Sequence, residues 1–241
     1  MPIVLKRLES NEEVENFSDT YSGKAFDFSK YYHDASTKGK SVLYSYIDTI
    51  NSFIKDSLSI DQNYIIGYYA TPEHIDEVTI LMEALLIENP KDRYEFIYNS
   101  ACNYLDSKFS QCNYCDFCND KCIADRETSS SKLMGCCHSY ELKSFLGIPI
   151  YKNERVCEHL INKTCETKNI SCKLFTCKYL KNKGIKFNPN NILYLDYFFN
   201  MKQKDIIRFN FFKTKEEIID KLLIKDHTPY IWWLFTRKYK I

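Results

Sequence analysis

The sequence predicts a mainly α protein, with helical N- and C-terminal parts around a loop-rich, cysteine-liganded metal-binding centre and at most a small β element. Apolar residues recur at helical spacing before residue 108 and after residue 180, whereas this periodicity is weak in between. Ten of the eleven cysteines fall in that middle stretch. Three regions follow: an acidic, mainly helical region at 1–107, a cysteine-rich metal-binding region at 108–180, and a basic helical C-terminal region at 181–241 that packs on the rest.

The first sixty residues are expected to begin with a short strand and to continue as helices. Val4, Leu5 and Leu8 indicate the strand. Ser10 and Glu13 are the first and last residues of a capping box. In this motif the serine hydroxyl accepts from the amide of Glu13, and the glutamate side chain reaches back to the start of the helix. A helix over 41–54 is predicted from apolar residues at helical spacing, namely Val42, Tyr46, Ile47, Ile50 and Ile54.

Residues 64–69 are β-branched and aromatic, and this short run predicts a second strand. Thr71 and Pro72 then predict a helix start, with the threonine as N-cap and the proline at the first helical position. That helix is expected to stop near Asn89. A further helix is predicted over 92–105, because its apolar residues fall on one side.

Helices are expected to return after Cys177. Residues 191–199 are rich in aromatic side chains, and residues 203–211 are amphipathic. Thr214 and Glu217 are the first and last residues of a second capping box, which predicts the start of another helix.

The chain ends in an apolar and then basic stretch that contains Trp232 and Trp233. We expect this stretch to pack onto the fold, and the alternative is an aromatic platform for nucleobases. Residues 1–100 carry 9 Lys and Arg against 17 Asp and Glu, while residues 178–241 carry 14 against 6. The oppositely charged ends either attract each other, or the basic 178–241 region meets an anionic partner such as nucleic acid.

The cysteine spacings allow several thiolates to share one metal. They read C-x2-C-x2-C-x3-C from Cys112, then a doublet, then C-x7-C-x6-C-x4-C to Cys177. One helical turn would place Cys118 and Cys122 on the same face, and Cys115 stands at knuckle-turn spacing from Cys118. The adjacent cysteines of the doublet point apart, so both rarely bind the same ion. The last two cysteines converge only if one of them precedes a helix start.

These spacings predict that the metal ligands come from nine cysteines. One site takes Cys115, Cys118, Cys122 and one of Cys136 and Cys137, and a second takes Cys157, Cys165, Cys172 and Cys177. A single centre drawing on both halves fits the spacing equally well. We expect Cys112 to be the spare and Cys102 to be a core residue. His159 is a further candidate ligand, although a lone histidine is more often a surface residue, and His138 is the other histidine of the segment.

An all-thiolate ligand set suits either a [4Fe-4S] cluster or Zn2+, at one or two sites. The first spacing matches bacterial ferredoxins, but Ile123 replaces the proline that normally follows. We expect a cytoplasmic protein with no membrane segment, because no signal-like apolar stretch or run of about 20 apolar residues occurs. In such a reducing compartment thiols stay free or bind metal.

The order of the cysteines resembles that of a known bacterial family. The pattern C-x3-C, CC, C-x-x-L, C and C-x4-C is similar to the bacterial cysteine-rich family described as a zinc- or iron-chelating domain, over Cys118, Cys122, Cys136-Cys137, Cys157 to Leu160, Cys165, Cys172 and Cys177. Flagellin lysine N-methylase is similar in this segment, and there the resemblance implies an iron–sulfur cluster that serves methyl transfer from S-adenosylmethionine. This chain is short and departs from the methylase pattern at 173–176. Only the metal ligands are therefore carried over.

Several enzyme classes are disfavoured by the sequence. Six scattered glycines form neither a dinucleotide-binding fingerprint nor a phosphate-binding loop, and the spacings of radical S-adenosylmethionine enzymes, zincins and zinc deaminases are missing. We therefore expect a cytosolic metal-binding protein of binding or regulatory type, whose metal is mainly structural and whose partner is an unknown protein.

Three alternatives remain open. The first is an iron–sulfur enzyme or electron-transfer protein resembling protein-lysine N-methylase, with Asp125, Arg126, Glu127 and His138 as the nearest acid–base candidates. The second is a nucleic-acid-binding or phage-encoded inhibitor protein with a zinc-stabilised centre. The third is thiol chemistry without metal at a cysteine of lowered pKa.

Overall fold

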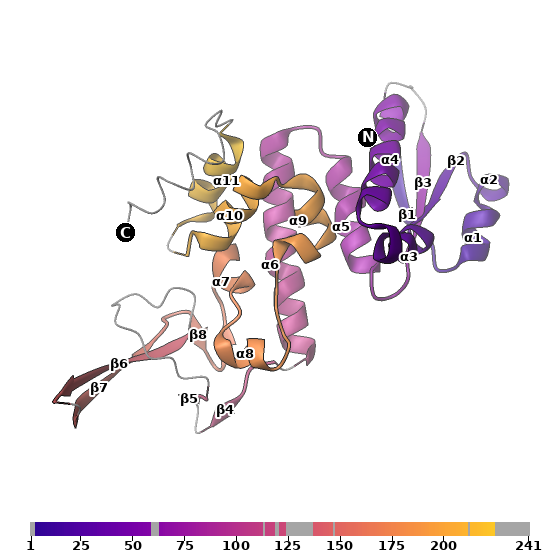
Figure 1. Cartoon of the computed structure of the whole chain (residues 1–241). Coiled ribbons are helices and arrows are strands. Elements are labelled where there is room, and N and C mark those ends of the chain that lie inside the picture. Colours follow the sequence, from indigo (N-terminus) through magenta and orange to yellow (C-terminus); the bar gives the residue numbers. More distant parts are fainter. Residues whose placement is uncertain are drawn as a thin grey trace. The chain divides into compact units, whose positions relative to one another are not determined.

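We describe a computed structural model of the chain, shown in Figure 1. The structure describes residues 3–58, 63–112, 114–118, 121–123, 137–146, 148–211 and 213–224, with the side chains of 121, 138–145 and 149–155 left out. The chain divides into two compact units, Met1–Ile97 and Tyr98–Ile241. Helices account for most of the regular structure in the described residues, so the mainly α prediction is confirmed.

A three-stranded parallel sheet forms the centre of the first unit. Its strands are β1 (Ile3–Arg7), β2 (Gly23–Asp27) and β3 (Tyr64–Tyr69), in the order β1-β3-β2. The register places Ile3 opposite Tyr64 and Gly23 opposite Ile65. The first and third strands were predicted, whereas the edge strand β2 was not.

Five helices belong to this unit. They are α1 (Asn11–Glu15), α2 (Phe17–Thr20), α3 (Ser29–Lys38), α4 (Ser41–Leu58) and α5 (Ile75–Leu85). The predicted cap of α1 is present, since the Ser10 hydroxyl accepts from the amide of Glu13 at 3.2 Å, while the Glu13 carboxylate accepts from the amide of Glu9. Thr71 is not the N-cap of this helix, because α5 begins at Ile75 and its N-cap residue is His74.

Apolar side chains at helical spacing fill the core of the first unit. Ile47, Ile50 and Ile54 of α4 are fully buried, as their spacing predicted. Val78 and Leu81 of α5 are equally buried.

Two glycines allow the segment between β1 and β2 to lie directly on the sheet. A Cβ at Gly67 would stand 2.6 Å from the ring of Phe17, and a Cβ at Gly23 would stand 1.9 Å from the carbonyl oxygen of Ile65. No real side chain tolerates either distance. Gly67 is therefore required by the close packing of the buried Phe17, and Gly23 by the pairing of β2 with β3.

The second unit starts within α6 (Pro90–Cys112), the longest helix of the described chain. It continues through three two-stranded hairpins: β4 (Phe117–Cys118) with β5 (Lys121–Cys122), β6 (His138–Phe145) with β7 (Ile148–Val156), and β8 (Leu160–Ile161) with β9 (Thr164–Cys165). Helices follow: α7 (Ile170–Leu174), α8 (Lys178–Asn182), the 3-10 helix η1 (Pro189–Asn191), α9 (Leu193–Phe198), α10 (Met201–Phe209) and α11 (Lys215–Leu223).

The helices after the cysteines agree with the sequence in type and place. The predicted capping box of α11 is complete: the Thr214 hydroxyl accepts from Glu217 and the Glu217 carboxylate accepts from Thr214. A further capping box, at Asn200 and Gln203 of α10, was not predicted. The stretch with Trp232 and Trp233 lies outside the described residues. Among the helices that are described, none has the length and apolar character needed to cross a membrane.

Candidate metal centre

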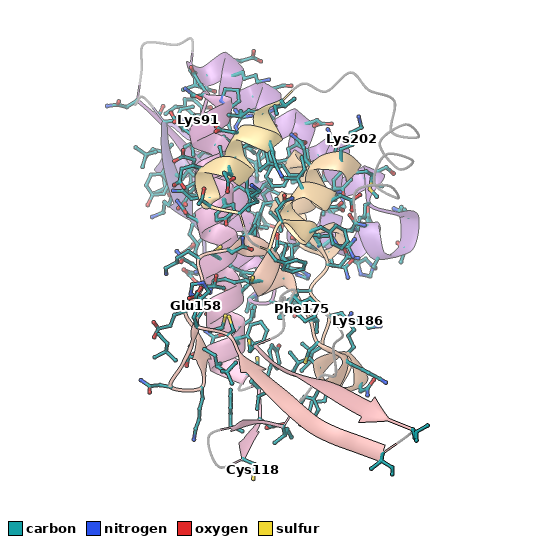
Figure 2. The ribbon with its side chains drawn as sticks, turned by 90° about the vertical axis from the view of Figure 1, so that its left-hand side faces the viewer. Lys91, Cys118, Glu158, Phe175, Lys186 and Lys202 are labelled. Carbon is teal, nitrogen blue, oxygen red and sulfur yellow. The ribbon has the colours of Figure 1, made fainter. Side chains whose placement is uncertain are left out.

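The first cysteines lie on a hairpin and not on a helix. Phe117 pairs with Cys122 and Cys118 pairs with Lys121 across β4 and β5. Because alternate residues of a strand face opposite sides, Cys122 shares the side of its partner Phe117 and Cys118 takes the other side. Cys115 precedes β4, and its thiol is influenced by that of Cys122. Cys118 is exposed, and Figure 2 shows it at the outer edge of this hairpin. The prediction that one helical turn aligns Cys118 with Cys122 is wrong.

The base of the longer hairpin brings two further cysteines side by side. The amide of Cys157 donates to the carbonyl of Cys137 at 2.8 Å, next to the pair formed by His138 and Val156. Both cysteines are half-buried. Cys136 lies outside the described residues.

A tight turn positions Cys165 near Cys157. Asn162 and Lys163 have φ angles of 47° and 67°, the left-handed pair that a two-residue hairpin turn between β8 and β9 requires. Cys165 stands opposite Leu160, whose amide donates to the carbonyl of Cys157 at 3.0 Å. The chain from Cys157 to Cys165 therefore forms a compact knuckle.

Two short helices carry the last cysteines. The Asn169 side chain caps α7 and accepts from the amide of Cys172 at 3.0 Å. Cys177 is the N-cap of α8, so it precedes a helix start, which is the condition for convergence set by the spacing. Both thiols are half-buried.

The thiols influence one another across both halves of the segment. Burial, followed by the nearby thiols of Cys122, Cys177 and Cys165, raises the pKa of Cys115 to about 11. Burial, followed by Cys165 and Cys157, raises the pKa of Cys172 to about 12. A hydrogen bond from Cys137 lowers the pKa of Cys165 to about 6.

Seven cysteines are therefore joined as neighbours. We call them the cysteine cluster: Cys115, Cys122, Cys137, Cys157, Cys165, Cys172 and Cys177. The neighbours of Cys115 come from before and after the β6–β7 hairpin. The cysteines that the structure describes form no disulfide with one another.

The thiols of the cluster are gathered but are not arranged around a common point. Within the described residues, no group of three or more His, Cys, Asp or Glu side chains is positioned to hold a metal ion. Electrostatic influence acts over longer distances than ligation, which needs every sulfur about 2.3 Å from the ion. Thiols that influence one another's pKa can therefore lie too far apart to ligate one ion.

The other predicted residues divide between the core and the surface. Cys102 is buried in α6, as predicted, and burial raises its pKa to about 11. Cys112 is exposed and hydrogen-bonds Tyr114, whose pKa it raises. His159 is half exposed beside Glu158, 3.8 Å away. The side chain of His138 and the residues Asp125, Arg126 and Glu127 lie outside what the structure describes.

Helix α6 contacts α7 and the residues just before it, and these contacts were not predicted from the sequence. The Tyr98 hydroxyl donates to the carbonyl of Lys168 at 2.9 Å and accepts from the amide of Ile170 at 3.0 Å. The Lys173 ammonium forms an ion pair with Asp106. Lys173 shares the apolar face of α7 with Ile170, three residues earlier, and a lysine in that position was the signal available in the sequence.

The basic C-terminal helices offer a less uniform cationic surface than the sequence indicated. Lys204 is buried and pairs with Asp196, which is also nearly buried. Lys204 belongs to the basic 178–241 region for which the sequence offers nucleic acid as a partner. A buried and paired ammonium cannot contact a phosphate backbone without breaking its pair.

The first unit carries a shallow hollow of about 630 Å³ between β2, α3 and α4. The stacked rings of Tyr31 and Tyr46 line it, with centroids 3.6 Å apart. Lys24 also lines it, and its ammonium lies over the ring of Phe53 at 5.0 Å. These contacts are explained by the packing of α3 and α4 against the sheet edge.

A scan against protein-family models found no match, and searches of curated proteins and of solved structures found none either.

Proposed function

We propose that this protein is a metal-binding protein of binding or regulatory type, and that the cysteine cluster holds a structural iron–sulfur cluster or zinc. The supporting observation is the gathering of seven cysteines from three hairpins and two helices, with thiols that act on one another across the whole segment. Thiolates are the ligands that zinc and iron–sulfur clusters share.

A structural role is supported by how little else holds this part of the chain. The strands β4, β5, β8 and β9 have two residues each. Hairpins this short are not stable by themselves, since they bury almost no apolar surface. A metal bound at their cysteines would supply the missing free energy, as it does in small metal-dependent domains.

Elemental analysis combined with absorbance spectroscopy tests the proposal. Protein purified under anaerobic conditions is expected to contain zinc or iron in stoichiometric amount. Iron with a broad absorbance band near 400 nm would identify an iron–sulfur cluster, whereas a colourless protein with zinc would identify a zinc site. Protein without metal that also fails to bind added Zn2+ would overturn the proposal.

The same preparation distinguishes the enzymatic alternative. A redox-active cluster together with calorimetric binding of S-adenosylmethionine would favour an iron–sulfur enzyme. A redox-inert metal without such binding would support the structural role. Salt-dependent retention on nucleic acid tests the remaining alternative, which the pairing of Lys204 with Asp196 weakens.

A further inference from the structure

Lys173 is a charged residue in a place where charges are rare. It lies in α7 directly after Cys172, and its side chain is only 3% exposed. Removing an ammonium from water is costly unless a partner compensates for the lost hydration. The partner present is Asp106 of α6.

The ion pair is asymmetric in its exposure. The Asp106 side chain is 45% exposed, so solvent screens the negative end. The buried positive end contacts the backbone of the cysteine segment, since the Lys173 Nζ lies 3.5 Å from the carbonyl oxygen of Cys165. Its charge also acts on the thiols of Cys165, Cys172 and Cys102. The pair therefore presents its cation to the cysteine cluster.

We propose that Lys173 is a positioning residue whose fixed positive charge stabilises the metal-loaded, thiolate form of the cysteine cluster. This inference rests on the proposed function. Each thiol that becomes a ligand releases its proton to solvent, and four thiolates around one Zn2+ leave two excess negative charges. A [4Fe-4S] cluster with four thiolates is also anionic. A buried cation beside the ligands offsets this charge at little cost, because the lysine is already desolvated.

The competing explanation is that the ion pair simply connects α6 to α7. Two substitutions at the same pair separate these roles, because they change the local charge in opposite directions. K173M removes the cation, and we expect it to weaken metal affinity by about 10–100-fold, as loss of a residue that supports metal ligands does. D106N keeps the cation and removes the competing carboxylate, so affinity should be unchanged or tighter. A purely connecting pair predicts equal loss in both variants.

A second buried ion pair of the same unit provides the matched control. Lys204 of α10 pairs with Asp196 of α9, and both side chains are 10% exposed. K204M should lower the thermal unfolding temperature about as much as K173M does, but should leave metal affinity within about twofold of the wild type. K173R retains the charge and should recover most of the affinity lost in K173M.

The measurement is a titration of the reduced, metal-free full chain with Zn2+ in competition with a chromophoric chelator, repeated with Cd2+ and read by thiolate-to-metal absorbance. Weakening in K173M alone supports the role of Lys173. Equal affinity in the wild type and K173M, or equal weakening in K173M and D106N, overturns it. Absence of binding by the wild type instead overturns the proposed function, so the two failures are distinguishable. If K173M does not fold, D106N against K173R still decides, because a connecting pair requires D106N to lose affinity.

Discussion

The sheet of the first unit and the cysteine segment of the second differ in what fixes their chains. In the first unit, helices such as α4 place side chains like Ile47 and Ile50 in full burial. Between residues 114 and 169, no hydrophobic side chain that the structure describes is buried, and Leu146 and Ile148 are 87% and 69% exposed. Apolar packing therefore accounts for the first region, whereas we expect the described part of the cysteine segment to depend on a different source of stability.

The largest effect is expected from metal removal. Treating the purified protein with a chelator should destabilise the segment around the cysteines by on the order of 10 kcal/mol, the scale of structural zinc binding. Limited proteolysis should then cut between residues 114 and 177 while Met1–Ile97 stays resistant. Unchanged proteolysis after complete metal loss would contradict the comparison.

The affinity of the protein for metal should also fall as pH is lowered. The ligands must lose their protons to bind, and the pKa values of Cys115 and Cys172 are raised.

Substitutions of individual cysteines test the comparison between the two regions further. Cys165→Ser removes a member of the cysteine cluster that contacts both halves, and we expect loss of most bound metal. Cys118→Ser changes an exposed thiol on the opposite side of its hairpin, and the metal content should be retained. Metal analysis of both variants checks this, and the reverse result would return Cys118 to the ligand set.

The first unit should respond to a cavity instead. Ile50→Ala removes a fully buried side chain of α4, and a loss of about 2–5 kcal/mol in unfolding free energy is expected. Metal content should not change. Chemical denaturation with metal analysis tests both parts, and metal loss in this variant would show that the two regions depend on each other.

Loss of the contacts between α6 and the start of α7 should give a smaller effect. Tyr98→Phe leaves the Ile170 amide without its hydrogen-bond partner and leaves the Lys168 carbonyl with only the Cys102 thiol, at a cost of about 1–3 kcal/mol. Metal affinity should decrease together with stability, because these contacts hold the start of α7 and the residues before it in place. Tyr104→Phe is a comparable change on the same helix and should affect metal affinity little.

The smallest effect concerns the outer contact between β4 and α8. Asp116 pairs with Lys183 at 2.5 Å and accepts from the Tyr179 hydroxyl, and these two contacts lower its carboxyl pKa. A lowered carboxyl pKa stabilises the fold above the ordinary pKa, and this contribution disappears as pH falls through the folded-state value. Asp116→Asn should remove this acid dependence and should lower stability slightly at neutral pH, where the contribution of the carboxylate is fully present. An NMR titration of the carboxyl groups measures the pKa of Asp116. An ordinary pKa there would contradict the contact with Lys183 and Tyr179.

What could be predicted from the sequence follows the same division. The helix at 41–54 and the cap at Thr214 were found because period and capping chemistry are local. The hairpin at Cys118 and Cys122 was not, because a spacing of four fits both a helical turn and a two-residue turn between strands. Apolar neighbours normally decide between these options, and they are scarce there. Lys173 was missed since its ion pair with Asp106 spans 67 residues of sequence.

The bare backbone at Gly23 and Gly67 has a practical consequence for recognising proteins built like this one. Thiol patterns can arise independently on unrelated scaffolds, but the crossover at Gly67 and the neighbouring strand at Gly23 leave room for hydrogen alone. A remote homologue of the first unit should therefore have glycine at the two matching positions of neighbouring strands, even if every cysteine has been replaced.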